Sequence, residues 1–297
     1  MSLDLISLDS FDTPRKSVLI TGANQGIGFE TARLLARKDY NVTIACRNES
    51  RAKEAVAKLR AKSPNVEIDY VICDLSKLDT VKDCARKLIA TNRLYDVLIL
   101  NAGVLLPSEK RTSDDLETTF QVNYLAQYLL ATLLIRHQRE HGHQLRVVCL
   151  TSVLHRLCGT LYGVKKTSDK WQKMFSDTEN GKKWKAYAMS KFATAMMSVN
   201  LSQLPGVTAV AVHPGAVRTE MTCKISQKTQ KYGKIFKGML ISPEEAAENV
   251  FNCVEREYQT GQYQNAKKVS KLSKSVRNEQ YCKSLEILSH QLLEKYL

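Results

Sequence analysis

The stretch Thr21-Gly22-Ala23-Asn24-Gln25-Gly26-Ile27-Gly28 separates an apolar segment from the start of a helical pattern. Its glycines have the spacing Gly-x-x-x-Gly-x-Gly, which permits a tight turn and lets a ligand approach the backbone closely. Free N–H groups and the helix dipole at such a turn stabilise a bound phosphate. The pattern predicts a strand, a phosphate-binding turn and a helix, although glycines that only form a tight turn would show the same spacing. The turn residues predicted to bind a dinucleotide are Gly22, Asn24, Gln25, Gly26, Ile27 and Gly28.

Short apolar, β-branched segments alternate with helical patterns on both sides of this turn. The segments are continuously apolar, which is typical of strands buried on both faces of a parallel sheet. The alternation predicts an α/β fold of the Rossmann type, a doubly wound parallel sheet with helices on both faces. The predicted strands are residues 17–21, 41–47, 66–73, 96–100, 146–151 and 207–213, and the predicted helices are 27–38, 49–62, 79–91, 114–139, 185–203 and 242–257.

The chain contains no internal repeat and no flexible linker, so a single domain over residues 15–264 is expected. Residues 1–14 are expected to form a loose arm, and residues 265–297 a basic, partly helical tail. The last predicted helix of the domain begins with Ser242-Pro243-Glu244-Glu245. This sequence supplies a helix cap, a proline at the first position and acids in the first turn.

The composition is that of an ordinary globular protein, with 297 residues, 43% hydrophobic and 25% charged. It excludes disordered and collagen-like classes, and no apolar run approaches the roughly 18 to 20 residues of a transmembrane helix. None of the eight cysteines forms a Cys-x-x-Cys pair or has zinc-finger spacing. We therefore predict no metal site and expect reduced thiols in a cytoplasmic compartment. The first residues lack the basic start of a secretory or transit peptide.

The net charge of +14 has three interpretations. It could bind nucleic acid, contact an anionic membrane surface, or attract a phosphate-bearing cofactor. Much of the charge lies in residues 165–191, 224–237 and 267–283, without a recognisable nucleic-acid-binding motif beside it. A solvated basic surface is the simplest explanation. We expect no nucleic-acid partner, and a peripheral membrane contact stays open.

The predicted second strand ends in Ala45-Cys46-Arg47-Asn48, which contains no carboxylate. An NAD site usually has an acid near this position to bind the ribose hydroxyls, whereas an arginine accommodates the 2′-phosphate of NADP. Arg47 can pair with a phosphate in forked geometry. The sequence therefore favours NADP(H), with Arg47 and Asn48 as cofactor-binding residues. An ordinary surface cation is the alternative for Arg47.

Tyr187 and Lys191 are four residues apart in a predicted helix and therefore share one face. A free tyrosine has a pKa of about 10, too high for proton exchange at neutral pH. A neighbouring ammonium group would lower the pKa of the phenol. Such a pair also occurs by chance on many helices, so its interpretation depends on the other motifs.

These motifs occur in a fixed order and together resemble the short-chain dehydrogenase/reductase family over about residues 15–262. Within that family the chain is most similar to the retinol dehydrogenase-like and WW-domain oxidoreductase-like group. The segments that carry this closer similarity are Ile44-Ala45-Cys46-Arg47, Leu100-Asn101-Ala102-Gly103-Val104 and His213-Pro214-Gly215. The motifs of the whole family, in chain order, are Thr21–Gly28, Asp74, Asn101-Ala102-Gly103, Asn123, Ser152, Tyr187 with Lys191, and Pro214-Gly215 with Thr219.

The resemblance implies a catalytic set. Tyr187 would exchange a proton with the substrate oxygen, and Lys191 would tune Tyr187 and bind the nicotinamide ribose. Ser152 would hold the substrate carbonyl, and Asn123 would keep a water in the proton relay. Thr151 could share the role of Ser152.

The resemblance also implies further cofactor contacts. Asp74 would contact the adenine, Asn101 would support the sheet near the cofactor, and the segment from Pro214 to Thr219 would bracket the nicotinamide. His155 could face the pocket, whereas His213 is interpreted as a strand-end histidine. The cofactor-binding residues implied beyond the turn and Arg47 are Asn48, Asp74, Leu75, Asn101, Ala102, Gly103, Tyr187, Lys191, Pro214, Gly215, Val217 and Thr219.

These roles imply an NADP(H)-dependent oxidoreductase that interconverts an alcohol and an aldehyde or ketone, on an apolar compound such as a retinoid, a steroid or a lipid-derived aldehyde. The alternative is a catalytically weak, cofactor-binding scaffold or regulator with the same fold.

The lysine-rich segment at 153–186 is expected to cover the substrate pocket or to form a partner surface; its aromatic residues could equally be a small core. Family resemblance also suggests a homodimer through the helices at 114–139 and 185–203. The side chains expected at that interface are Leu125, Leu129, Leu133, Ala195 and Val199.

Overall fold

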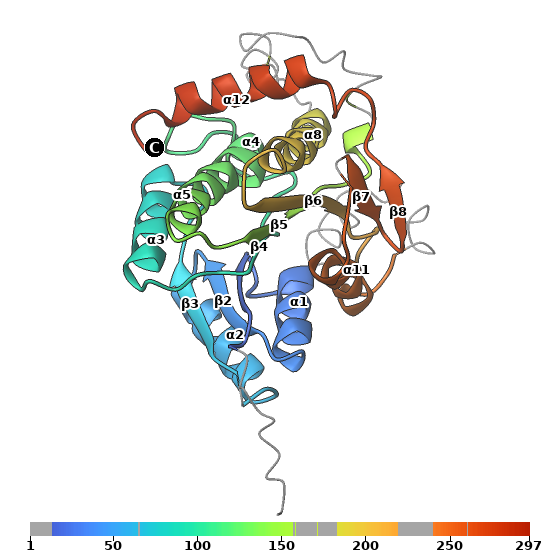
Figure 1. Ribbon diagram of the computed structural model, residues 1–297. Helices are drawn as coiled ribbons and strands as arrows, with labels where there is room; N and C mark the ends of the chain where they lie inside the picture. The colour runs from blue at the N-terminus through green and yellow to red at the C-terminus, as the bar shows by residue number, and fades with distance from the viewer. Residues whose placement is uncertain are drawn as a thin grey trace, which may run out of the picture.

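A single eight-stranded sheet organises the computed structural model, which describes residues 14–64, 66–156, 158, 171, 183–218, 240–259 and 261–297. The strand order is β3-β2-β1-β4-β5-β6-β7-β8, and every neighbouring pair is parallel except β7 with β8. The sheet confirms the predicted doubly wound fold (Figure 1). The strands are β1 (Ser17–Thr21), β2 (Asn41–Cys46), β3 (Ile68–Ile72), β4 (Val97–Leu100), β5 (Leu145–Leu150), β6 (Val207–His213), β7 (Gln262–Asn265) and β8 (Lys268–Lys271).

Helices cover both faces of the sheet, as the continuously apolar strands require. Alternate residues of one strand enter two separate cores: Val18 and Ile20 join one cluster and Leu19 the other. Helices α1, α2 and α11 pack on the first face, and α3, α5 and α8 on the second (Figure 1). The helices are α1 (Gly26–Arg37), α2 (Glu49–Arg60), α3 (Leu78–Ala90), α4 (Thr118–Phe120), η1 (Gln121–Leu125), α5 (Ala126–Glu140), α8 (Lys183–Leu201), α11 (Pro243–Glu255) and α12 (Glu279–Leu293).

The helix predicted over 114–139 begins later and is interrupted. The carboxylate of Glu117 accepts hydrogen bonds from the backbone N–H groups of Thr119 and Phe120, so the helix begins at Thr118. The next turn, η1, is a π-helix, which inserts an extra residue into the helical ladder. The hydrophobic pattern of the sequence revealed the helix but not this irregular turn.

Residues 265–297 form integral structure where a tail was expected. The expected domain boundary after residue 264 falls inside β7, which pairs with β6, and the chain continues through β8 into α12. On α12, Leu285, Leu288 and Leu293 lie at helical spacing and are buried. The partly helical expectation agrees with α12, but the basic residues that mostly precede this helix, between Lys267 and Arg277, made the whole segment resemble a tail. None of the described helices is both long enough and apolar enough to cross a bilayer.

The contribution of α12 to stability can be measured with two neighbouring substitutions. Leu288 is 2% exposed and Ile287 is 44% exposed. We expect Leu288→Ala to lower the free energy of unfolding by about 2–4 kcal/mol, because it leaves a cavity in the core. Ile287→Ala should cost less than about 1 kcal/mol. Urea unfolding followed by circular dichroism tests both, and equal small effects would contradict the integration of α12 into the domain.

Candidate active site

Most of the predicted cofactor-binding residues, and Ser152, follow the carboxyl ends of adjacent parallel strands and therefore meet at one edge of the sheet, whereas Asn123, Tyr187 and Lys191 lie on helices η1 and α8. The chain leaves β1 toward β2 and β3, but leaves β4 toward β5 and β6, so the order reverses between β1 and β4. Ligands of doubly wound sheets bind in the crevice at such a reversal. The glycine turn follows β1 at this point.

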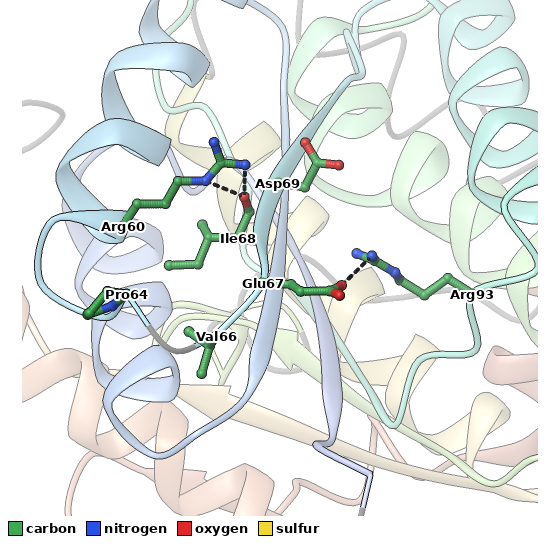
Figure 2. Close-up of a pocket in the computed structure, with 7 residues that line it drawn as sticks. All are labelled: Arg60, Pro64, Val66, Glu67, Ile68, Asp69 and Arg93. Carbon is green, nitrogen blue, oxygen red and sulfur yellow. Dashed lines mark hydrogen bonds and ion pairs between the residues drawn. The ribbon is translucent and has the colours of Figure 1, made fainter.

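A hollow of about 530 Å³ lies at the opposite end of the edge strand β3 and is unrelated to this crevice (Figure 2). Its walls include an ion pair between Arg93 and Glu67, with the nitrogen and oxygen 2.7 Å apart. Arg60 donates two hydrogen bonds to the carbonyl oxygen of Ile68. These charges already have protein partners, so the hollow offers little to a polar ligand.

The glycine turn forms a cradle that side chains would fill. Gly22 and Gly26 have φ angles of +65° and +60°, a conformation that favours glycine. A Cβ atom on Gly28 would lie 2.5 Å from Nδ2 of Asn101 and 2.8 Å from the carbonyl oxygen of Gly22. Helix α1 begins here, and the side chain of its N-cap residue, Gln25, makes no capping hydrogen bond. The turn therefore fits the phosphates of a dinucleotide.

Asn101 fastens the turn to the end of β4. Its Nδ2 donates to the carbonyl oxygen of Thr21 at 2.8 Å. The hydroxyl of Thr21 accepts hydrogen bonds from the backbone N–H groups of Asn101 and Ala102, each at 3.0 Å. Gln127 completes the link, because its Oε1 accepts from the Thr21 hydroxyl and its Nε2 donates to the carbonyl oxygens of Ala102 and Asn123. The sequence analysis missed Gln127, although its position one helical turn after Asn123 was a usable signal.

Arg47 and Asn48 have different surroundings although they are adjacent. β1 pairs with β2 so that Thr21 faces Ala45, which places the exposed Arg47 beside the turn. No hydrogen bond or ion pair is assigned to its guanidinium within the described ranges, so it can receive an anion. The side chain of Asn48 accepts a hydrogen bond from the backbone N–H of Arg51 at 2.9 Å and caps α2. The geometry therefore gives Asn48 a structural role and leaves at most its remaining polar atoms for a cofactor.

Asp74 and Leu75 follow β3 at the same edge. One carboxylate oxygen of Asp74 accepts hydrogen bonds from the backbone N–H and the hydroxyl of Ser76, which hold the turn. Leu75 is buried, and its carbonyl oxygen accepts from Nε2 of Gln121. The second carboxylate oxygen of Asp74 is the group through which it can contact an adenine.

Helix α8 carries Tyr187 and Lys191 on one face, as their spacing predicted. Nζ of Lys191 lies 5.9 Å from the centroid of the Tyr187 ring. Burial raises the pKa of Tyr187 to about 12, and a hydrogen bond with Ser152 opposes part of this rise. The expected lowering of this pKa by the ammonium of Lys191 is not found in the described chain: burial raises the pKa, and the contact that lowers it is the hydrogen bond with Ser152.

Lys191 is itself changed by burial. Its ammonium group donates to the carbonyl oxygen of Leu150 at 2.8 Å. Burial lowers the pKa of Lys191 to about 8. The side chain is thus charged below about pH 8 and loses its proton above it, close to the physiological range.

Asn123 and Lys191 both approach Gly103. A Cβ atom on this glycine would lie 3.3 Å from Oδ1 of Asn123 and 3.3 Å from Nζ of Lys191. Oδ1 of Asn123 accepts from the backbone N–H of Val104 at 2.7 Å, and its Nδ2 donates to the carbonyl oxygen of Val104 at 3.0 Å. Glycine at 103 therefore leaves room for both polar groups at the end of β4.

Ser190 connects Asn123 to Tyr187, a role the sequence analysis did not assign. Nδ2 of Asn123 donates to Oγ of Ser190 at 3.0 Å, and Ser190 donates to the carbonyl oxygen of Tyr187 at 2.8 Å. Ser190 is fully buried. Its place directly before Lys191 in the chain was the available signal.

Ser152 follows β5 and is held by its neighbours. His155 is fully buried, and its Nδ1 donates to the carbonyl oxygen of Ser152 at 2.6 Å. Burial lowers the pKa values of His155 and His213 to about 4, so both are neutral at pH 7. The buried hydroxyl of Thr151 donates to the carbonyl oxygen of Lys191 at 2.6 Å, which occupies it structurally. Thr151 therefore does not duplicate Ser152.

The segment after β6 is described only in part. The carbonyl oxygen of Pro214 accepts from Nδ2 of the buried Asn249 at 2.9 Å. Gly215 has a φ of +113°, and a Cβ atom there would lie 2.5 Å from Cδ1 of Ile241. Val217 forms a parallel bridge with Ile241. Thr219 lies outside the described residues, as do the arm at 1–13 and most of the segment expected to cover the substrate pocket; Trp171 is described and is buried.

A phosphate-binding turn at the reversal of a parallel sheet, with a serine after the neighbouring strand β5 and a tyrosine and a lysine on α8, defines the class as a dinucleotide-dependent oxidoreductase of the Rossmann type. A family model described as short chain dehydrogenase matches residues 16–168. The chain belongs to the short-chain dehydrogenase family, whose fold binds NAD or NADP, and it is retinol dehydrogenase-like.

Known proteins similar to this chain agree with that membership. Retinol dehydrogenase 12 of Mus musculus is 34% identical over 94% of this chain and 87% of its own length. Polyprenol dehydrogenase of Homo sapiens is 30% identical over 96% of this chain and 83% of its own length. A crystal structure of an uncharacterised protein from Mycobacterium paratuberculosis superimposes with a TM-score of 0.70 at 22% identity, over 95% of this chain and 96% of that one.

The apolar faces expected at a dimer interface are largely covered within one chain. Leu125, Leu129 and Ala195 are fully buried, Val199 is 8% exposed, and Leu133 is partly buried. They lie in or against the same core as Leu285 and Leu288 of α12, two residues that were not expected at the interface. A homodimer stays a prediction, and these particular side chains offer it little free surface.

The link through Ser190 can be tested against a matched serine. Ser198 lies on the same helix, is buried, and makes the same bond to the carbonyl oxygen three residues earlier, at 2.8 Å. We expect Ser190→Ala to lower kcat by about tenfold, because it leaves Nδ2 of Asn123 with one partner fewer and loosens Tyr187. Ser198→Ala should leave kcat within about twofold. Steady-state kinetics decide, and equal losses would show that Ser190 only stabilises the helix.

Proposed function

We propose that this chain is an NADP(H)-dependent oxidoreductase that interconverts an alcohol and an aldehyde or ketone by hydride transfer. The observation that carries the proposal is the convergence on Tyr187 of a hydrogen bond with Ser152 and of the ammonium of Lys191, which also approaches Gly103 at the end of β4. Each side chain has the donor or acceptor that reduction of a carbonyl requires. The family of the chain supports the same class of reaction.

The proposed reaction divides the work between cofactor and protein. When bound, the nicotinamide supplies or accepts the hydride. The hydroxyl of Ser152 orients the substrate oxygen by hydrogen bonding. In reduction, the hydroxyl of Tyr187 donates its proton to that oxygen, and in oxidation the phenolate would accept it. Lys191 places a positive charge near the Tyr187 ring. Asn123 connects the end of β4 to α8 through its hydrogen bonds with Val104 and Ser190.

The protonation state of the site favours the reductive half of this scheme. Because the pKa of Tyr187 is about 12, the phenol retains its proton at neutral pH. It is therefore ready to act as an acid. To act as a base it must first lose that proton, which costs more the further the pKa lies above the ambient pH.

Arg47 supports NADP(H) as the cofactor. Its exposed guanidinium lies at the end of β2, beside the strand that leads into the turn. No carboxylate occurs at that strand end to bind the ribose hydroxyls in its place. The anionic 2′-phosphate of NADP would give Arg47 a charged partner.

Apolar side chains near the site support an apolar carbonyl or alcohol as substrate. Val153 follows Ser152 directly and is 42% exposed, and Trp184 precedes Tyr187 by one helical turn and is 45% exposed. The printed names of two relatives are dehydrogenases of retinol and polyprenol, both apolar alcohols. We infer a substrate such as a retinoid, a steroid or a lipid-derived aldehyde.

The state of the cysteines supports a proposal for the cellular location. All the cysteines that the structure describes are buried and free. Free thiols are typical of a reducing compartment, so a cytoplasmic location is proposed. A peripheral membrane contact stays a prediction for the basic segments.

Loss of the phenol hydroxyl tests the enzymatic proposal. We expect Tyr187→Phe to lower turnover at least about a thousandfold in an NADPH-consumption screen over aldehydes, ketones, quinones and retinoids, because the proton donor is removed. Binding of NADPH, followed by its fluorescence, should change less than about twofold. Turnover that survives the substitution would reject Tyr187 as the acid. Tight NADPH binding without any turnover in the unchanged protein would favour the scaffold or regulator.

Removal of one positive charge tests the choice of cofactor. We expect Arg47→Gln to weaken NADPH binding by about 10- to 100-fold and to leave NADH binding unchanged, because only NADPH carries the 2′-phosphate. Lys58 is the matched control, since it is exposed near the far end of α2 and paired with Glu54. Lys58→Gln should change neither affinity. NADH bound as tightly as NADPH by the unchanged protein would contradict the proposal.

A further inference from the structure

Helix α12 lies across the helical layer that contains α4, α5 and α8 (Figure 1). It contacts three segments that carry or flank the proposed catalytic residues. We propose that α12, with the residues just after it, is a positioning element of the active site. It holds the π-helix η1, and with it Asn123, through the hydrogen bond between Ser289 and Tyr124 and through Tyr296, which binds the same carboxylate as Gln121. This inference rests on the proposed function, since positioning is judged by its effect on turnover.

The first contact joins Tyr124 of η1 to Ser289 of α12. Their hydroxyl oxygens are 2.8 Å apart, and both side chains are buried. The hydroxyl of Ser289 also donates to the carbonyl oxygen of Leu285 at 2.8 Å. Because a serine has only one hydroxyl proton, Tyr124 must donate to Ser289. Asn123 directly precedes Tyr124, so this bond restrains the backbone from which the Asn123 side chain extends.

The second contact reaches the other end of η1. Nε2 of Gln121 donates to one carboxylate oxygen of Asp114 at 2.7 Å. The hydroxyl of Tyr296, just beyond α12, donates to the other oxygen at 3.4 Å. Asn123 therefore lies between Tyr124, which binds α12 directly, and Gln121, which is connected through Asp114 to Tyr296 just after α12.

A π-helical turn gives these contacts a physical purpose. Its hydrogen-bond ladder is less favourable than that of an α-helix and persists where the surroundings support it. An α-helix through Gln121–Leu125 would rotate Asn123 relative to the backbone of Val104 that it now binds through both its oxygen and its nitrogen. Support from α12 on the outer side of η1 favours the π turn and so the observed direction of Asn123.

Aromatic rings extend the same contact along the helix. Tyr124 and Tyr128 stack with ring centroids 5.9 Å apart. The hydroxyl of Tyr128 lies 3.1 Å from Nε2 of His290, and the two rings meet edge to face. Two successive turns beside Asn123 are thus fixed to one turn of α12.

Helix α12 also holds a residue from the segment between Ser152 and Tyr187. Nε1 of Trp171 donates to Oγ of Ser284 at 3.1 Å. The Trp171 ring stacks on Phe192 of α8, with centroids 6.1 Å apart. Trp171 is fully buried between these helices. One helix therefore supports both Asn123 and the helix that carries Tyr187 and Lys191.

The experiment compares hydroxyl removal on the two sides of the contact. We expect Ser289→Ala and Tyr124→Phe each to lower kcat about five- to tenfold, with the affinity for NADPH within about twofold of the unchanged protein. The kcat of the double variant should be no lower than that of the less active single variant, because both substitutions remove the same bond. Ser289→Thr keeps the hydroxyl and should restore kcat.

A matched control and a second readout separate positioning from stability. Gln291→Ala alters an exposed residue on the same helix and should leave kcat unchanged. Hydrogen–deuterium exchange of a peptide spanning residues 121–125 should speed up in Ser289→Ala and not in Gln291→Ala. Variants that unfold more easily but keep their kcat would overturn the proposal.

Failure of the two proposals can be told apart. If the unchanged protein turns over no carbonyl or alcohol, the proposed function fails, and the exchange of residues 121–125 still reports whether α12 holds η1. If the unchanged protein is active and neither kcat nor exchange responds to Ser289→Ala, the positioning role alone is wrong.

Discussion

The junction between β1 and β4 is the constraint on which the site depends. The buried Thr21 hydroxyl and the half-buried Asn101 carboxamide join the ends of these two strands through hydrogen bonds of 2.8–3.0 Å. Water cannot easily replace such bonds, and leaving either partner unpaired would cost free energy. The glycine turn, the approach of Asn123 to Gly103 and the start of α1 all take their positions from this junction. A sheet that reverses its order at the same place brings the remaining strand ends beside it.

Burial, more than charge, sets the protonation of Tyr187 and Lys191, the proposed catalytic pair. The same removal from water raises the pKa of Tyr187 and lowers the pKa of Lys191, because each loses the solvent that stabilises its charged form. The two groups are therefore both closer to neutrality than their free counterparts. A site of this kind holds a proton ready for a substrate oxygen without requiring a permanent ion pair. The bond from Ser152 gives the phenol its one described stabilising contact against this rise.

On the second face of the sheet, a peripheral helix, α12, is packed so that it can affect the proposed active site. The core of this face includes β-strand residues, α5, α8 and the apolar stripe of α12. Packing at this density transmits the position of one helix to the next. A substitution on α12 therefore acts on Asn123 through one intervening tyrosine. The opposite face reaches the site through the glycine turn at the start of α1, through Arg47 before α2, and through Asn249 of α11, which binds the carbonyl oxygen of Pro214.

Most of the features that the sequence alone determined depend on residues close together in the chain. The turn at Gly22–Gly28, the buried strands and the four-residue spacing of Tyr187 and Lys191 depend on local backbone geometry, and the structure places each of them as predicted. The order of the motifs was enough for the family. The roles of Ser190 and Gln127, the π turn at Asn123, the rise in the pKa of Tyr187 and the integration of α12 depend on contacts between distant segments. Only the tertiary structure decided these, because burial and hydrogen-bond partners arise when the chain has packed and leave no periodic trace in the sequence.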